Sequence, residues 1–107
     1  MSLGEFEQLV LLAIVRLKDD VYGVPIVEEI ERQTGRNVDR AAVYVTLRRL
    51  EQKGFISSHM SKPTPERGGK ARRCVRMESA GLRALRESRN VLEQMWSGLD
   101  AALGKVR

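Results

Sequence analysis

Two arginines, a tyrosine and small side chains share one face of the segment 40–53. This segment is predicted to be a helix, and at about 100° per residue Val43, Leu47 and Leu50 point to its inner side. The opposite side carries Ala41, Val45, Arg48 and Gln52, with Tyr44 and Arg49 at its two edges. A guanidinium group can donate to both major-groove acceptors of guanine, so Arg48 is the candidate for a base contact. Arg40 is the candidate for a phosphate contact, because the helix dipole favours anions at a helix start.

Two of these side chains have alternative interpretations. Tyr44 could belong to the core, but it lies well round the helix from the inward-facing leucines. That position favours exposure and a hydrogen bond to phosphate. Arg49 could contact nucleic acid, or it could pair with an acidic side chain of the preceding predicted helix, such as Glu28 or Glu29. Both interpretations of Arg49 remain open.

A second cluster of positive charge lies on a predicted β-hairpin with strands over residues 55–60 and 71–77. The connecting loop is rich in Gly and Pro. Residues 62–76 hold six basic side chains and one acidic one, and so much like charge on one hairpin is hard to explain without a polyanionic partner. Five of the basic side chains are candidates for contact through phosphate charge: Lys62, Arg67, Lys70, Arg72 and Arg73.

The distribution of charge along the chain singles out the same region. Residues 1–39 carry 4 basic and 8 acidic side chains, net −4, whereas residues 40–89 carry 13 basic and 4 acidic ones, net +9. Residues 90–107 carry two of each. This asymmetry favours a polyanionic partner, and a solvated basic surface without a partner is the alternative.

Length and residue usage exclude several classes of protein. A chain of 107 residues has room for one small domain and none for a separate catalytic domain. The apolar run 9–15 is far shorter than the ~20 residues of a membrane span, and no secretion leader is recognisable. A single cysteine fits a reducing cytosol. We therefore expect a cytoplasmic protein. One histidine and one cysteine predict neither a metal site nor a cofactor, and no nucleophile–base set or phosphate-binding Gly motif indicates an enzyme.

Two predicted helices carry more apolar surface than one small core needs. In the first, Leu11, Leu12 and Val15 lie off the main apolar face, so a second side must meet another element or another subunit. From Ser79 onward one long helix is predicted, in which Leu82, Leu85, Arg89, Leu92, Trp96, Leu99 and Leu103 recur at heptad spacing. This seam packs either against the chain's own first helix or between two subunits. The candidates for a subunit interface are Leu11, Leu12, Val15, Leu85, Leu92, Trp96, Leu99 and Leu103.

The order of three helices, a hairpin and a long helix predicts a mainly α fold with a small β-hairpin (α+β). It is the order of a winged helix-turn-helix, with 40–53 as the recognition helix in the major groove and 57–76 as a wing on the backbone or minor groove. We expect a DNA-binding domain over residues 1–78 and a dimerisation helix over residues 79–107. A winged-helix module that binds a protein and no DNA is the alternative.

Several stretches of the sequence resemble the PadR family of transcriptional regulators. The similar stretches are Leu9 to Leu17 followed by Tyr22-Gly23 and Ile26, the run AVYVTLRRLEQKGFI over 42–56, and the run PTPERGGKARR over 63–73. They correspond to the family's opening, to its recognition helix with the first wing strand, and to the wing of one group of members. The sequence departs from the family before Gly81, where Met77-Glu78 replace a common Leu-Thr, so the cap of the last helix is weaker or moves to Ser79.

The resemblance implies a homodimer that binds a pseudo-palindromic operator in double-stranded DNA and usually represses transcription. It places the dimer interface on the first and last helices. It also implies an apolar cavity at that interface, where a small aromatic or drug-like effector would bind beside Trp96. Plain packing of Trp96 in the seam is the alternative.

Overall fold

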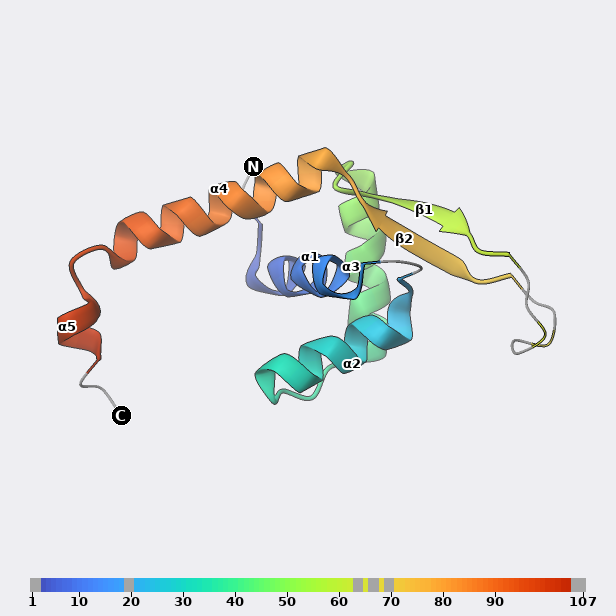
Figure 1. Ribbon diagram of the computed structural model, residues 1–107, viewed down its shortest axis with the longest axis horizontal. Helices are drawn as coiled ribbons and strands as arrows, with labels where there is room; N and C mark the ends of the chain where they lie inside the picture. Colours follow the sequence, from blue (N-terminus) through green and yellow to red (C-terminus); the bar gives the residue numbers. More distant parts are fainter. Residues whose placement is uncertain (1–2, 19–20, 63–64, 66–67, 69–70, 105–107) are drawn as a thin grey trace.

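The protein consists of four longer helices, one short helix and a two-stranded hairpin (Figure 1). The computed structural model describes residues 3–18, 21–62, 65, 68 and 71–104. The elements are α1 (Glu5–Leu17), α2 (Gly23–Thr34), α3 (Arg40–Gln52), β1 (Ile56–Met60), β2 (Arg73–Met77), α4 (Ser79–Trp96) and α5 (Asp100–Leu103). The predicted fold class, mainly α with a small hairpin, is confirmed.

The core surrounds α1, which contacts α2, α3, β2 and α4. Its side chains Val10, Leu11 and Ile14 are almost completely buried and pack with apolar residues of the other elements. Leu11 therefore corrects an expectation: it is 0% exposed within its own chain and has no surface to offer a second subunit. Leu12 and Val15, the other two residues off the main stripe, are 45% and 42% exposed.

Local signals set the ends of the first three helices. Asp39 caps α3 by accepting a hydrogen bond from the amide of Ala41 at 2.9 Å, and Gly35 ends α2 in a left-handed conformation. The start of α1 is set by a local contact as well. The helix begins after Gly4, whose amide donates to the Glu7 carboxylate at 3.0 Å.

The hairpin pairs β1 with β2 in antiparallel register, from Ile56 opposite Met77 to Met60 opposite Arg73. The second strand starts two residues later than the sequence predicted, at Arg73. A third segment joins its other edge, because the amide of Val75 donates to the carbonyl of Val21 at 2.7 Å. The link between α1 and α2 is thereby fastened to the hairpin.

The first turn of α4 lies close to the backbone of Phe55, in the link between α3 and β1. A Cβ on Gly81 would lie 2.4 Å from the carbonyl oxygen of Phe55, so only glycine fits there. Glu78 occupies the cap position without a side-chain cap, as the departure from the family pattern predicted. Its carboxylate instead accepts a hydrogen bond from the Ser57 hydroxyl at 2.7 Å.

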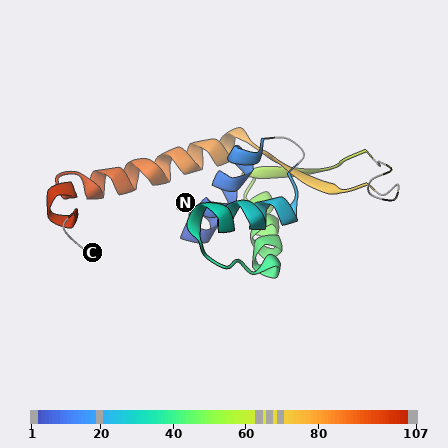
Figure 2. The same ribbon diagram turned by 60° about the horizontal axis from the view of Figure 1, so that its bottom comes forward.

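Beyond its first turns, α4 runs away from the three-helix unit, and the hairpin points in the opposite direction (Figures 1 and 2). The molecule is correspondingly elongated, 56 × 29 × 21 Å. The expected single helix through Leu103 is wrong, because α4 ends at Trp96 and Gly98 turns the chain with φ of 81° before α5. The exposed part of α4 carries Leu92 and Trp96, each 51% exposed.

Candidate nucleic-acid interface

The helix α3 has one buried face and one exposed face. Val43, Leu47 and Leu50 are buried, as predicted, and Thr46 is buried beside them. On the other side Arg40, Ala41, Tyr44, Val45, Arg48 and Arg49 are all exposed. A helix with one packed face and one face of small, aromatic and cationic side chains has the form that enters a groove.

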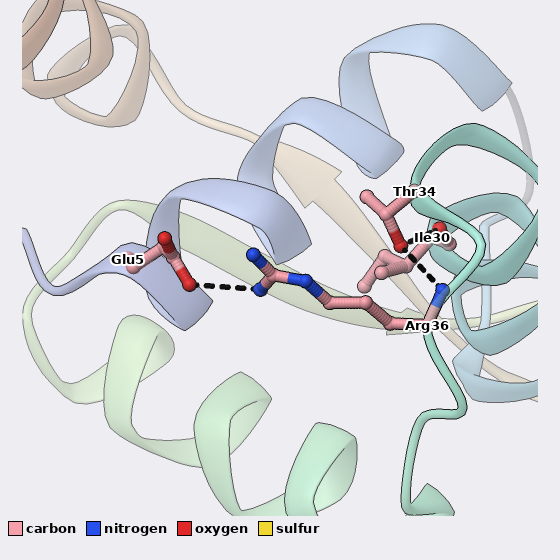
Figure 3. A network of polar contacts seen from close by, with 4 residues as sticks. All are labelled: Glu5, Ile30, Thr34 and Arg36. Atoms are coloured by element: carbon pink, nitrogen blue, oxygen red, sulfur yellow. Dashed lines mark hydrogen bonds and ion pairs between the residues drawn. The ribbon is translucent and has the colours of Figure 1, made fainter. Parts of the chain in front are cut away.

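The link from α2 to α3 is held from both sides, which fixes where α3 begins. Arg36 in this link donates to the Glu5 carboxylate of α1 at 2.9 Å, and its amide donates to the Thr34 hydroxyl at 3.2 Å (Figure 3). Further along, the amide of Val38 donates to the Glu31 carboxylate at 2.9 Å. These contacts tie the turn of the helix-turn-helix to α1 and to α2.

The other end of α3 is tied to α1 by an ion pair. The ammonium group of Lys53 lies 2.8 Å from the carboxylate of Glu7, and both side chains are mostly buried. Burial alone would raise the pKa of Glu7, but the hydrogen bonds from Lys53 and from the Gly4 amide outweigh it and hold that pKa below its usual range. The nearby charge of Arg49 acts in the same direction.

Arg49 therefore has a different acidic neighbour from the one that the sequence suggested. The carboxylate of Glu29 accepts hydrogen bonds from Arg32 and Gln33 of its own helix. Arg49 lies in the field of Glu7 on α1 instead, while its side chain stays exposed.

The ring of Tyr44 packs against Gly23, which has no side chain. A Cβ on Gly23 would lie 2.5–2.6 Å from the outer atoms of the Tyr44 ring, so the glycine lets the ring lie against the start of α2. The ring nevertheless remains 46% exposed, which agrees with the predicted partial exposure. Its hydroxyl is thus presented at the junction of α2 and α3.

A shallow hollow separates α3 from the hairpin and brings Arg48 near Arg73. It is lined by Tyr44, Leu47, Arg48, Glu51, Ser58, Arg73 and Val75. Within the described part of the chain, Arg48 has no hydrogen-bond or ion-pair partner. Arg73 does have partners: its guanidinium donates to Ser58 at 3.1 Å and to Glu51 at 3.3 Å. The hydrogen bond from Ser58, and then Arg73, keep the pKa of Glu51 below its usual range.

The remaining predicted wing residues are distributed unevenly. Lys62 is exposed at the end of β1, whereas the guanidinium of Arg72 lies over the Tyr22 ring, 3.9 Å from its centre. Arg67 and Lys70 lie outside the described residues. Tyr22 and Glu51 were not among the predicted site residues. The only sequence signal for Tyr22 was its place in the Tyr22-Gly23 pair.

Four of the eight apolar residues predicted for a subunit interface line a second hollow. A groove of about 450 Å³ between α1 and α4 is lined by Leu12, Leu85, Leu92 and Trp96, with polar residues at its rim. Leu85 is partly buried and packs against the chain's own core. In contrast, Leu92, Trp96 and Leu99 are exposed, by 51%, 51% and 45%. The start of α4 therefore packs on its own chain and the later turns do not. Nothing is described of the Leu103 side chain.

Among the described residues, no group of three or more His, Cys, Asp or Glu side chains is placed to hold a metal ion. No helix among them is both long and apolar enough to cross a membrane.

Comparison with known proteins assigns the chain to a family. The family model described as "Transcriptional regulator PadR-like family" matches residues 11–87, which include α2, α3 and the whole hairpin. The chain belongs to the PadR-like family of transcriptional regulators. The sequence resemblance to PadR proteins is thus confirmed, and the outer face of α3 and the hairpin are the helix and wing of a PadR-type winged helix.

Relatives and solved structures agree with this assignment to the PadR family. The chain is 35% identical over 77 residues to "Transcriptional regulator Rv3488" of Mycobacterium tuberculosis (strain ATCC 25618 / H37Rv), covering 72% of this chain and 67% of that protein. The crystal structure of a PadR family regulator from Eggerthella lenta DSM 2243 is similar, with 27% identity, a TM-score of 0.68 and coverage of 96% of this chain and 88% of that one. A PadR-like regulator from Bacillus cereus strain ATCC 14579 shares the fold, with 20% identity, a TM-score of 0.72 and coverage of 95% and 93%.

Proposed function

We propose that this PadR-like regulator is a repressor that binds a pseudo-palindromic operator in double-stranded DNA as a homodimer. In this proposal α3 lies in the major groove, and the hairpin over residues 57–76 lies on the backbone or in the minor groove. The single observation that carries it is the outer face of α3, where Arg48 is exposed and has no partner among the described residues.

Each side chain on that face has a role in the proposal. Arg48 donates to the major-groove edge of a guanine, and Ala41 and Val45 let the helix approach the bases closely. Arg40 and Tyr44 contact phosphates at the start of α3 and set its register on the duplex. Lys62, Arg67 and Lys70 of the wing contribute phosphate contacts whose strength falls with salt.

The proposed dimer uses the apolar surface that one chain leaves uncovered. Leu12 and Val15 on α1, with Leu92, Trp96 and Leu99 after the first turns of α4, are each at least 42% exposed. Apolar side chains at heptad spacing are covered when two helices pack together. Two copies joined in this way would present two α3 helices to the two halves of a palindrome.

The groove between α1 and α4 suggests an effector site within the same dimer. Its walls include Trp96 and three leucines, and the Arg89–Glu93 ion pair, 2.8 Å long, borders it. Such a mixture of an aromatic wall with a few charged groups suits a small aromatic or drug-like molecule. Binding of such a molecule between subunits would change the spacing of the two α3 helices.

The DNA-binding proposal is tested with the region upstream of the protein's own gene. Wild-type protein should shift this DNA in a gel at low salt and lose affinity as salt rises. Arg48→Ala should weaken specific binding by about 1–3 kcal/mol, while Arg83→Ala, an equal loss of charge on α4, should preserve the preference for the operator. If the wild-type protein binds no DNA at low salt, the proposal is wrong and a protein-binding module becomes the better hypothesis.

A further inference from the structure

The link between α1 and α2 contacts the wing through both its backbone and a side chain. The carbonyl of Val21 accepts the Val75 amide of β2 at 2.7 Å. The next residue, Tyr22, places its ring under the guanidinium of Arg72, at 3.9 Å from the ring centre. A guanidinium at this distance from an aromatic face is attracted by the ring's quadrupole. Val75 of β2 and Arg72, the residue just before this strand, are therefore held against the same short link.

Arg72 also pairs with Ser61 of the other half of the hairpin. The amide of Ser61 donates to the Arg72 carbonyl at 2.7 Å, and the amide of Arg72 donates to the Ser61 hydroxyl at 3.1 Å. This pair precedes the loop that carries Arg67 and Lys70.

The residue after Tyr22 contacts the recognition helix. A Cβ on Gly23 would lie 2.5–2.6 Å from the ring of Tyr44, so the ring rests directly on this glycine. Two consecutive residues, Tyr22 and Gly23, thus touch the base of the wing and the exposed face of α3. This dipeptide therefore connects the two parts of the proposed DNA interface through non-covalent contacts.

We propose that Arg72 is a positioning residue: its guanidinium stays on the Tyr22 ring and sets the direction of the wing relative to α3. This role replaces the phosphate contact that the sequence suggested for Arg72. The inference rests on the proposed DNA binding for its consequence, but the contact itself exists in the free protein. A guanidinium is well suited to this place because it is planar and can stack on a ring while its N–H groups remain hydrated.

The contact can be tested without DNA. In the NMR spectrum of the free protein, the Arg72 side-chain protons should be shifted upfield by the ring current of Tyr22. Tyr22→Phe retains the ring and should retain the shift, whereas Tyr22→Leu should abolish it. Unchanged Arg72 shifts in Tyr22→Leu, in a protein whose circular dichroism is that of the wild type, would overturn the proposal.

The role in DNA binding is tested by comparing Tyr22→Leu with Arg72→Gln. If Arg72 acts through Tyr22, each single variant should weaken operator binding by about two- to five-fold. The double variant should bind no more weakly than either single variant. The two single variants should have the same dependence of affinity on salt. Tyr22→Phe should bind like the wild type. Arg76→Gln, which removes an equal charge from β2, measures the effect of net charge alone.

A contact between Arg72 and a phosphate predicts a different pattern of affinities. If Arg72 contacts a phosphate, Tyr22→Leu will bind like the wild type and Arg72→Gln alone will lower the slope of log K against log salt by about 0.9. Wild-type affinity in both single variants also overturns the positioning role. If the wild-type protein binds no operator, the proposed function fails, and the ring-current experiment still decides whether Tyr22 holds Arg72.

Discussion

The ammonium group of Lys53 donates a hydrogen bond of 2.8 Å to the carboxylate of Glu7, and this pair joins the end of α3 to the start of α1. The same carboxylate accepts the Gly4 amide, so Glu7 both starts α1 and holds the recognition helix. Each charge is mostly removed from water, which makes either partner costly to leave alone.

Removing one member of this pair should destabilise the fold. We expect Lys53→Met to lower the free energy of unfolding by about 2–4 kcal/mol, because the Glu7 carboxylate would remain buried without its ion-pair partner. Urea denaturation followed by circular dichroism measures this change. The double variant Glu7→Leu/Lys53→Met should recover part of the loss, and a double variant as unstable as the two single losses combined would contradict the pairing.

The same pair predicts how stability depends on pH. The pKa of Glu7 is lower in the folded protein than its usual value, so its carboxylate adds stability above the unfolded pKa of about 4.3. That contribution is lost as pH falls through the lower folded pKa, when the carboxylate takes up a proton. The unfolding free energy of Glu7→Gln should therefore fall less steeply than that of the wild type below about pH 4.3. Parallel curves for the two proteins in this range would show that Glu7 does not titrate as described.

Two glycines should respond differently to the same substitution. Gly81→Ala places a Cβ against the carbonyl of Phe55, which is backbone and cannot rotate away, so we expect a loss of about 1–3 kcal/mol of stability. Gly23→Ala meets only the outer atoms of the Tyr44 ring, which can turn aside. It should cost less stability than Gly81→Ala and weaken operator binding more than Tyr44→Phe does. Thermal unfolding and a DNA titration of both variants provide the comparison.

The proposed dimer predicts a position-specific effect on α4. Trp96 faces the groove with Leu92, whereas Met95, 72% exposed, does not line it. Trp96→Ala should therefore shift the protein from dimer to monomer at micromolar concentration, and Met95→Ala should leave the dimer intact. Size-exclusion chromatography with light scattering measures both. A wild-type monomer, or dissociation by Met95→Ala alone, would show that the interface is assigned to the wrong face.

Much of the fold could be predicted because the signals are local. Asp39 and Gly35 mark helix ends through contacts within a few residues, and the burial of Val43, Leu47 and Leu50 follows from helical periodicity alone. The end of α4 also had a local signal in Gly98, which the heptad pattern of the leucines concealed.

The parts that could not be predicted depend on contacts between distant residues. Leu11 is buried because α1 is surrounded by four other elements, which the stripe of a single helix does not indicate. The hydrogen bond from Arg73 to Glu51 joins residues that are 22 positions apart. Arg72 likewise finds a ring that precedes it by 50 residues in the sequence, and no local pattern reports such a partner.

The bridge between Val21 and Val75 has a consequence for solubility. A hairpin has two outer edges, and the unpaired amides and carbonyls of an open edge invite strand addition by other chains. On β2 the amide of Val75 is already used, and the Val21 link covers that edge at its middle. A chain with so exposed a wing is thereby protected, along this edge, from growing an intermolecular sheet.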